Sequence, residues 1–451
     1  MFKLKEYGTN ARTEIIAGLT LFAAMAYIIP VNQSILGKDA GIPVGAVILA
    51  TCIAAAAGSL LMGLWANLPY GMAPGMGLNA FFTYTVVLGL GFSWQKALGM
   101  VFLSGVIDFI VTATGVRKHI VAALPKALRT AMGVGIGLFI AYIGIVNVGF
   151  ISFGDVPALA PINTTVLILG VIAIAVTIIL YVNKVPGAIL IAIIVMTIVG
   201  AFFGQVSMPW GTYFNELGSS FSQLGSVFGQ SIVSIPSIFS NPAQIVLAIA
   251  TIFAFSMTGL FDELGTSLGL GRATGLITEE EIDNVAQVKG FKTRFARSLV
   301  PPSIATMFGS LFGTSNTTTY VESSAGIAAG GKTGLTASTT GVLFLASILL
   351  APLAEAVPFY ATAPALIMVG ALMMRPVADI DWLDMEAAIP AFLAIAIMPF
   401  SYSITTGIAV GVIFYCLIKL FRGKIKEIHP VLAIIALLFI AYFVNEALAH
   451  G

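Results

Sequence analysis

Long apolar runs fill most of the chain, and polar residues gather where these runs end. A helix needs about 20 apolar residues to cross the hydrocarbon core of a bilayer. Runs of about that length cover 13–35, 44–66, 94–115, 127–148, 163–182, 185–204, 242–261, 335–353 and 429–448. Shorter runs cover 79–91, 296–312, 318–329, 360–375, 386–400 and 403–421. The pattern predicts an all-α polytopic membrane protein with about fourteen transmembrane segments and an additional C-terminal helix at 429–448.

The composition agrees with this class of protein. Hydrophobic residues make up 58% and charged residues 9% of the 451 positions, whereas soluble domains are roughly 25% charged. The net charge of +1 suggests no nucleic-acid partner. Cys52 and Cys416 lie far apart in apolar runs, which favours small core residues over a disulfide or a metal site. The histidines lie at segment ends, so proton relay within the membrane is left to carboxylates.

Positive charges predict the orientation. Cytoplasmic loops of membrane proteins carry an excess of Lys and Arg. Here the basic residues cluster after the fourth, eighth and fourteenth segments: Arg117, Lys118, Lys126, Arg129, Arg272, Lys289, Lys292, Arg294, Arg297, Lys419, Arg422, Lys424 and Lys426. The stretch 205–241 contains no Lys or Arg. We therefore expect a cytoplasmic N-terminus.

The two halves of the chain carry related interruptions. The third segment is short and follows the Gly/Pro-containing stretch 73–79, and the tenth is short and follows 313–316. Seven is an odd number, so two seven-segment halves must have opposite topology. Paired short segments of this kind indicate the substrate site of a transporter. The alternative is that they are loops or kinked helices in which glycine allows close packing.

Two polar stretches interrupt sequence that otherwise suits the membrane. Residues 261–266 end one apolar run with Asp262 and Glu263, and residues 313–324 combine hydroxyl groups with Glu322. An ionisable side chain inside the bilayer costs at least about 2.5 kcal/mol. Without a use or a partner such groups are expected to be rare, so these stretches are candidates for the functional centre.

Three motifs resemble the AzgA-like purine permeases, a branch of the nucleobase–ascorbate transporters that share the uracil-permease fold. The motifs are Ala73–Phe82, Phe261–Thr266 and Gly313–Gly334. Supporting stretches are Gly18–Phe22, Gly135–Ile140 and Lys184–Ala188. The resemblance runs from about residue 10 to about residue 445. It implies two inverted seven-segment repeats, with short strands before segments 3 and 10.

The resemblance also implies a domain division and a function. A core domain would comprise 13–115 and 242–356, a gate domain 120–204 and 360–421, and 429–448 would be additional. The family imports adenine, guanine or hypoxanthine together with protons. We therefore expect a symporter of the cytoplasmic membrane, not an enzyme, that needs no cofactor beyond the proton gradient. A homodimer formed through the gate domain is expected from the family alone.

Asp262 and Glu322 match the substrate carboxylates of the family by motif. Their chemistry fits independently, because purines present ring N–H and amino groups, and a carboxylate accepts such hydrogen bonds well. They are also the candidate proton-coupling groups, together with Glu263. The alternative is a structural ion pair, but neither segment contains a Lys or Arg.

Further substrate contacts are expected where the two half-helices begin. Asn79 and the hydroxyls of Thr317, Thr318 and Thr319 lie near these starts, and Val321 belongs to the same motif. A helix N-terminus leaves free N–H donors, although the hydroxyls could simply cap the helices. Thr266 lies one turn beyond Asp262 and is expected to face the same cavity.

Glu263 departs from the family pattern, which has a small residue there. The acidic residue usual early in segment nine is also replaced, by Pro301–Pro302. Glu263 could have taken over part of the proton coupling, or it could pair with Arg272 at a wet cytoplasmic rim. We favour the rim, because adjacent helical residues diverge by roughly 100°. For Asp108 we favour an ion pair with Arg117 or Lys118 over a place on a proton path.

Two competing interpretations are weaker. Residues 326–333 match the phosphate-loop pattern, but that pattern needs a soluble nucleotide domain around it, so we expect a Gly-rich helix end with Lys332 at the interface. An anion exchanger on the same inverted-repeat fold would need cationic or neutral sites, which Asp262 and Glu322 oppose.

Overall fold

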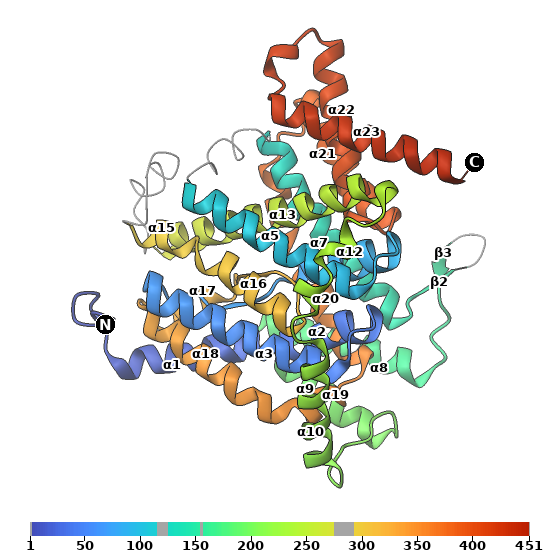
Figure 1. The fold of residues 1–451 in the computed structure, drawn as a ribbon. Coiled ribbons are helices and arrows are strands. Elements are labelled where there is room, and N and C mark those ends of the chain that lie inside the picture. The colour runs from blue at the N-terminus through green and yellow to red at the C-terminus, as the bar shows by residue number, and fades with distance from the viewer. Residues whose placement is uncertain (1, 115–124, 154–156, 275–292, 451) are drawn as a thin grey trace.

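The computed structural model describes residues 2–114, 125–153, 157–274 and 293–450, and nearly all of its regular structure is helical (Figure 1). Each predicted apolar segment overlaps helical structure, although the run 318–329 begins in a strand and becomes helical only at Ser323. Within the described residues, nine helical stretches are long and apolar enough to cross a membrane, and shorter apolar helices cover Met76–Gly89, Ala188–Phe202 and Met385–Phe400. The all-α polytopic class is confirmed, and the count of fourteen segments stays a prediction.

The first half of the chain runs from the N-terminus to the short connecting helices that precede residue 242. Its elements are α1 (Ala11–Met25), α2 (Ile28–Asn32), η1 (Gln33–Asp39), α3 (Val44–Leu61), η2 (Met62–Ala66), β1 (Met72–Pro74), α4 (Met76–Ala80), η3 (Phe81–Gly89), α5 (Trp94–Thr114), α7 (Lys126–Val148), β2 (Ile151–Phe153), β3 (Pro157–Leu159), α8 (Thr165–Val182), α9 (Ala188–Phe202), α10 (Tyr213–Val227), α11 (Gln230–Val233) and α12 (Ile235–Ile238).

The second half begins with a long helix that carries the first acidic motif. Its elements are α13 (Pro242–Thr274), α15 (Arg294–Ser298), α16 (Pro301–Phe312), β4 (Thr317–Thr319), α17 (Ser323–Ala328), α18 (Gly334–Ala346), η5 (Ser347–Leu350), α19 (Ala351–Glu355), α20 (Phe359–Met373), η6 (Arg375–Asp379), α21 (Met385–Phe400), α22 (Ile404–Phe421), η7 (Ile425–Glu427) and α23 (Pro430–His450).

The short strands expected before segments 3 and 10 are present, and they pair with each other. Strand β1 pairs antiparallel with β4, and Ala73 lies opposite Thr318. Extended backbone inside a membrane must satisfy its polar groups within the protein. The ladder does this for one edge of each strand, and because the strands are antiparallel, the half-helices α4 and α17 begin beyond opposite ends of it.

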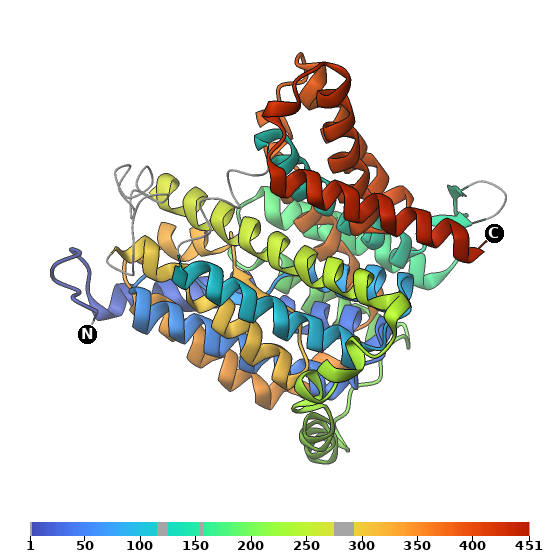
Figure 2. The ribbon, with the colours of Figure 1, turned by 45° about the horizontal axis from the view of Figure 1, so that its top comes forward.

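The helices form two packing groups. In the α3 group, α13, α5, α16, α3, α18 and α1 contact one another in that order, and Figure 2 shows them running roughly side by side. The group also includes η3, which contacts α5, β4, which contacts α13 and α16, and α17, which contacts α1. In the α7 group, α7 packs against α20 and α21, α21 packs against α22, and α20 also contacts α8 and α9. Glycine allows the closest crossing there: a Cβ on Gly370 of α20 would lie 2.4 Å from the carbonyl oxygen of Gly137 on α7. Helix α23 contacts both α22 and α13.

An aromatic cluster joins the two groups. Tyr84 of η3 stacks edge-on against Phe139 of α7 and against Tyr402, which precedes α22, at ring-centroid distances of 6.3 and 5.8 Å. The Tyr84 hydroxyl donates to Asp39 Oδ2 at 2.5 Å. Beside it, the amide of Ile404 donates to Thr85 Oγ1 at 3.2 Å. The α3 group and the α7 group are therefore in direct contact near Asp39, the last residue of the first helical span, Ala11–Asp39.

Candidate functional site

Helix α13 presents two different faces at the acidic motif. Asp262 and Thr266, one turn apart, are half-buried, whereas Glu263 and Ser267 are buried. This is the expected divergence of adjacent helical residues and alignment of residues four apart. The two neighbouring carboxylates therefore enter different surroundings.

Asp262 lies beside the antiparallel pair formed by β1 and β4. The Thr318 hydroxyl is within hydrogen-bonding reach of its carboxylate, and Glu263 and Glu322 are close enough to interact with it electrostatically. Successive residues on a strand point to opposite sides. Strand β4 accordingly places Thr318 near Asp262 and turns Thr319 toward Glu263.

Glu322 follows β4 and immediately precedes α17. Its Oε1 accepts a hydrogen bond of 2.6 Å from the hydroxyl of Tyr27, whose side chain is 1% exposed. Tyr27 was not identified from the sequence, and it lies at the break between α1 and α2. The sequence feature that could have identified Tyr27 is its position directly before Ile28–Asn32, where a proline interrupts the first apolar run. Tyr27 orients the carboxylate and leaves Oε2 to face another donor.

The other residues predicted to contact the substrate differ in how far their side chains are buried. Val321 is 51% exposed, beside the half-buried Glu322. Asn79 is fully buried, and its Oδ1 accepts a hydrogen bond from the Ser315 hydroxyl. Thr317 and Thr319 are also buried, and Thr319 donates its hydroxyl to Glu263. The structure thus places Asp262 beside Thr318, four residues before Glu322, and substrate contact by every one of these residues stays a prediction.

The expectation that Glu263 lies at a wet rim is wrong. Its side chain is 1% exposed, and its carboxylate accepts hydrogen bonds from the Thr319 amide, the Thr319 hydroxyl and the Ser267 hydroxyl at 3.0, 3.0 and 2.6 Å. Its expected partner, Arg272, lies in α13, but the structure does not describe the side chain of that residue, so the pairing stays a prediction. The physical reason is tertiary: the face of α13 that carries Glu263 meets β4, so the carboxylate is enclosed.

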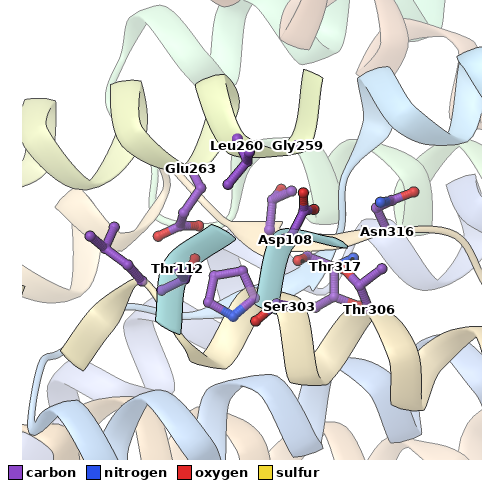
Figure 3. A pocket seen from close by; sticks show the side chains of 12 residues that line it. Asp108, Thr112, Gly259, Leu260, Glu263, Ser303, Thr306, Asn316 and Thr317 are labelled. Carbon is purple, nitrogen blue, oxygen red and sulfur yellow. Dashed lines mark hydrogen bonds between the residues drawn. The ribbon is translucent and has the colours of Figure 1, made fainter. Parts of the chain in front are cut away.

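A pocket lies on this second face of α13 (Figure 3). Its lining residues come from α5, α13, α16 and the approach to β4: Asp108, Thr112, Gly259, Leu260, Glu263, Leu299, Pro302, Ser303, Thr306, Asn316, Thr317 and Thr318. Asp262 and Glu322 are not among them. Thr318, whose hydroxyl reaches the Asp262 carboxylate, does line the pocket, so the pocket adjoins the place where Asp262 meets β4.

Asp108 contributes to this pocket from α5. It is 7% exposed, and its Oδ1 accepts a hydrogen bond from the Ser256 hydroxyl of α13. The carboxylate therefore joins α5 to the helix that carries Asp262. Arg117 and Lys118, its expected partners, lie outside the described residues, so that pairing stays a prediction.

The loop that resembles a phosphate loop holds a carboxylate of the protein itself. Glu14 of α1 is fully buried and accepts hydrogen bonds from the amides of Lys332 and Thr333 at 3.0 and 3.3 Å. It also accepts a bond of 2.6 Å from the Thr336 hydroxyl. Backbone N–H groups at a helix start bind anions well. Here Glu14 occupies that position at the start of α18, and Lys332 is exposed, as expected of an interfacial residue.

Comparison with known proteins identifies relatives along almost the whole chain. The adenine permease AdeP of Escherichia coli (strain K12) is 41% identical over 98% of this chain and 94% of its own. The guanine/hypoxanthine permease PbuG of Bacillus subtilis (strain 168) is also 41% identical, over 98% of both chains. The nucleobase transporter PlAzg2 of Paenibacillus larvae is 38% identical over 90% of this chain and 77% of its own.

Solved structures support the architecture at low sequence identity. The transmembrane domain of the cyanobacterial bicarbonate transporter BicA matches with a TM-score of 0.61, 15% identity, and 88% and 97% coverage of this chain and its own. SLC26A9 matches with a TM-score of 0.60 and 14% identity, covering 93% of this chain and 66% of its own. These likenesses support the inverted-repeat transporter fold. A profile of the Permease family matches residues 12–410. The chain is a multi-pass membrane protein that belongs to the Permease family and is a relative of its purine permeases.

Proposed function

We propose that this protein is a proton-coupled symporter that imports purine bases, namely hypoxanthine, guanine or adenine, across the cytoplasmic membrane. Relatives named as adenine and as guanine/hypoxanthine permeases are equally similar to it, at 41% identity. Their similarity supports the class of substrate and leaves the preferred base to experiment. The transported purine is the small-molecule partner, and the proton gradient takes the place of a cofactor.

The observation that carries the proposal is that β4 places Thr318 within hydrogen-bonding reach of Asp262, and that Glu322 follows on the same segment directly before α17. A purine base offers N–H donors on one edge, and carboxylates are strong acceptors for them. Thr266, Thr318 and Val321 belong to the proposed contact set with these carboxylates, and Asn79, Thr317 and Thr319 support it from the interior. An anion would be repelled at such a site. The likeness to bicarbonate and anion transporters concerns the fold alone.

The proposed mechanism is alternating access. The α3 group serves as the core domain and carries the substrate carboxylates, while the α7 group serves as the gate domain, through which two copies would dimerise. Core and gate touch through Tyr84, Phe139 and Tyr402. With the N-terminus in the cytoplasm, this cluster closes the outer side. Movement of the core relative to the gate would separate the rings and admit a base from outside.

Uptake by purified protein in proteoliposomes tests the proposal. Labelled hypoxanthine should accumulate in a saturable manner when the inward proton gradient is imposed, and a protonophore should abolish accumulation. Competition by unlabelled adenine, guanine, hypoxanthine, uracil and bicarbonate then defines the substrate. Inhibition by bicarbonate without inhibition by any purine would favour the anion exchanger, and accumulation unaffected by the protonophore would exclude proton coupling.

A further inference from the structure

The second edge of β4 is satisfied by side chains. One edge pairs with β1, and the amide of Tyr320 continues that edge by donating to the Gly71 carbonyl at 3.0 Å. The amides of Thr317 and Thr319 point to the opposite edge, as alternate residues of a strand do. The first donates to Thr306 Oγ1 and the second to Glu263 Oε2, each at 3.0 Å. Glu263 therefore accepts the hydrogen bond that a carbonyl oxygen of a neighbouring strand would otherwise accept on this edge.

Glu263 also binds the side chain of the same residue. Its Oε1 accepts the Thr319 hydroxyl at 3.0 Å, so Thr319 is held through both its backbone and its side chain. The Ser267 hydroxyl, one turn along α13, donates to Oε1 at 2.6 Å and fixes the carboxylate from its own helix. Bonds that use both oxygens of one carboxylate fix orientation as well as distance. The arrangement is a clamp between α13 and β4.

The clamp joins the two halves of the proposed purine site. Glu263 is the neighbour of Asp262 on α13, and Thr319 lies three residues before Glu322. Between them, Thr318 reaches back to Asp262. Movement of β4 along α13 would change the separation of the two substrate carboxylates. A binding constellation loses much of its strength when it is displaced by about 1 Å.

Resting on the proposed function, we infer that Glu263 is a positioning residue for purine binding: it sets the spacing of Asp262 and Glu322 by clamping Thr319, and it is not a proton carrier. Its carboxylate serves as the acceptor in each of these bonds. The departure of this position from a small residue therefore changes how the site is held together. The coupling group remains on the other face of the helix.

Substitution Glu263→Gln tests the inference in the full-length protein. The amide keeps the size of the side chain but replaces one acceptor oxygen with a donor, which cannot receive both bonds from Thr319. We expect the Kd for hypoxanthine to rise about tenfold or more, because a buried donor is left unpaired. At saturating hypoxanthine, accumulation driven by the proton gradient should persist. Wild-type affinity in this variant overturns the positioning role. Loss of proton-driven accumulation at saturating hypoxanthine overturns the statement that Glu263 is not a proton carrier.

Matched variants separate positioning from general damage. Ser310→Ala removes a buried hydroxyl of α16 that donates to the Met307 carbonyl and not to Glu263, and it should change the Kd by less than about threefold. Thr319→Val removes only the hydroxyl bond and should weaken binding less than Glu263→Gln does. The double variant should be non-additive, since both changes break the same clamp. Additive effects, or equal losses in Ser310→Ala, contradict the clamp.

The outcomes also distinguish this inference from the proposed function. If the wild-type protein binds none of the purine bases, the proposed function fails and the inference falls with it. If the wild-type protein binds and the Glu263 variants bind equally well, only the inference fails. Size-exclusion chromatography and Tm in detergent verify folding. Should Glu263→Gln not fold, Thr319→Val decides: wild-type affinity in that variant overturns the clamp.

Discussion

Replacing Glu322 by Gln should weaken purine binding by about tenfold to a hundredfold. One oxygen of this carboxylate receives the Tyr27 hydroxyl at 2.6 Å, which leaves the other for the substrate. In the Gln variant the amide oxygen satisfies Tyr27, and the NH2 group takes the place of the remaining acceptor. A purine N–H would then face a donor. Losing a hydrogen bond to a charged group costs about 1.5–3 kcal/mol, and each 1.4 kcal/mol corresponds to a factor of ten.

Binding of labelled hypoxanthine to purified protein measures this effect directly. Tyr27→Phe serves as the graded control, because it keeps the ring and removes only the orienting hydroxyl; we expect a loss of about two- to tenfold. Glu216→Gln on α10 is the matched substitution at an exposed carboxylate, which bonds to Thr212 at 2.5 Å, and it should leave the Kd unchanged.

Three results would refute this reasoning. Unchanged affinity in Glu322→Gln would remove Glu322 from the purine site. A larger loss in Tyr27→Phe than in Glu322→Gln would mean that the tyrosine, not the carboxylate, makes the main contact. Equal losses in Glu216→Gln would indicate a non-specific effect of removing a carboxylate.

Three further predictions concern coupling, stability and conformation. Asp262→Asn should abolish proton-driven accumulation, because the amide cannot carry a proton, and should also weaken purine binding, because NH2 replaces one acceptor oxygen; retained accumulation in proteoliposomes at saturating purine would exclude Asp262 as the coupling group. Glu14→Gln should lower the free energy of unfolding by about 1–3 kcal/mol, because amides at the start of α18 lose their acceptor, and an unchanged Tm would contradict that role. In a background without the two native cysteines, Tyr84→Cys combined with Tyr402→Cys should allow a cross-link that stops uptake until it is reduced. Continued uptake by fully cross-linked protein would show that core and gate need not part there.

The apolar pattern predicted the helices well because the membrane leaves few alternatives. A backbone in hydrocarbon must satisfy its own polar groups, so runs such as 127–148 have to be helical. The short strands at β1 and β4 have no such length signature. They were expected through the resemblance of their motifs, and the structure adds that they pair in the register Met72 with Thr319 and Pro74 with Thr317.

The candidate site could be predicted only in part, because its contacts join residues far apart in the sequence. Tyr27 and Glu322 are 295 positions apart, and no local pattern relates a tyrosine at a helix break to a carboxylate in the other half. Glu14 and the amides around Lys332 pose the same problem. Helical periodicity correctly predicted that Asp262 and Glu263 diverge. It could not tell which face of α13 would meet β4, and this is why Glu263 was wrongly expected at a wet rim.

The start of α16 gives the departure at Glu263 a physical setting. Pro301 and Pro302 occupy the first turn of that helix, where proline is well tolerated because the N–H it lacks would be unpaired there. One turn later, Thr306 receives the amide of Thr317, while Glu263 receives the amide of Thr319 from the opposite helix. The edge of β4 that does not pair with β1 is thus held by a hydroxyl from α16 and a carboxylate from α13. A carboxylate placed at Pro302 would line the same pocket as Glu263 and Asp108, and like charges in one enclosed space repel. The acid on α13 and the prolines on α16 are therefore physically compatible changes.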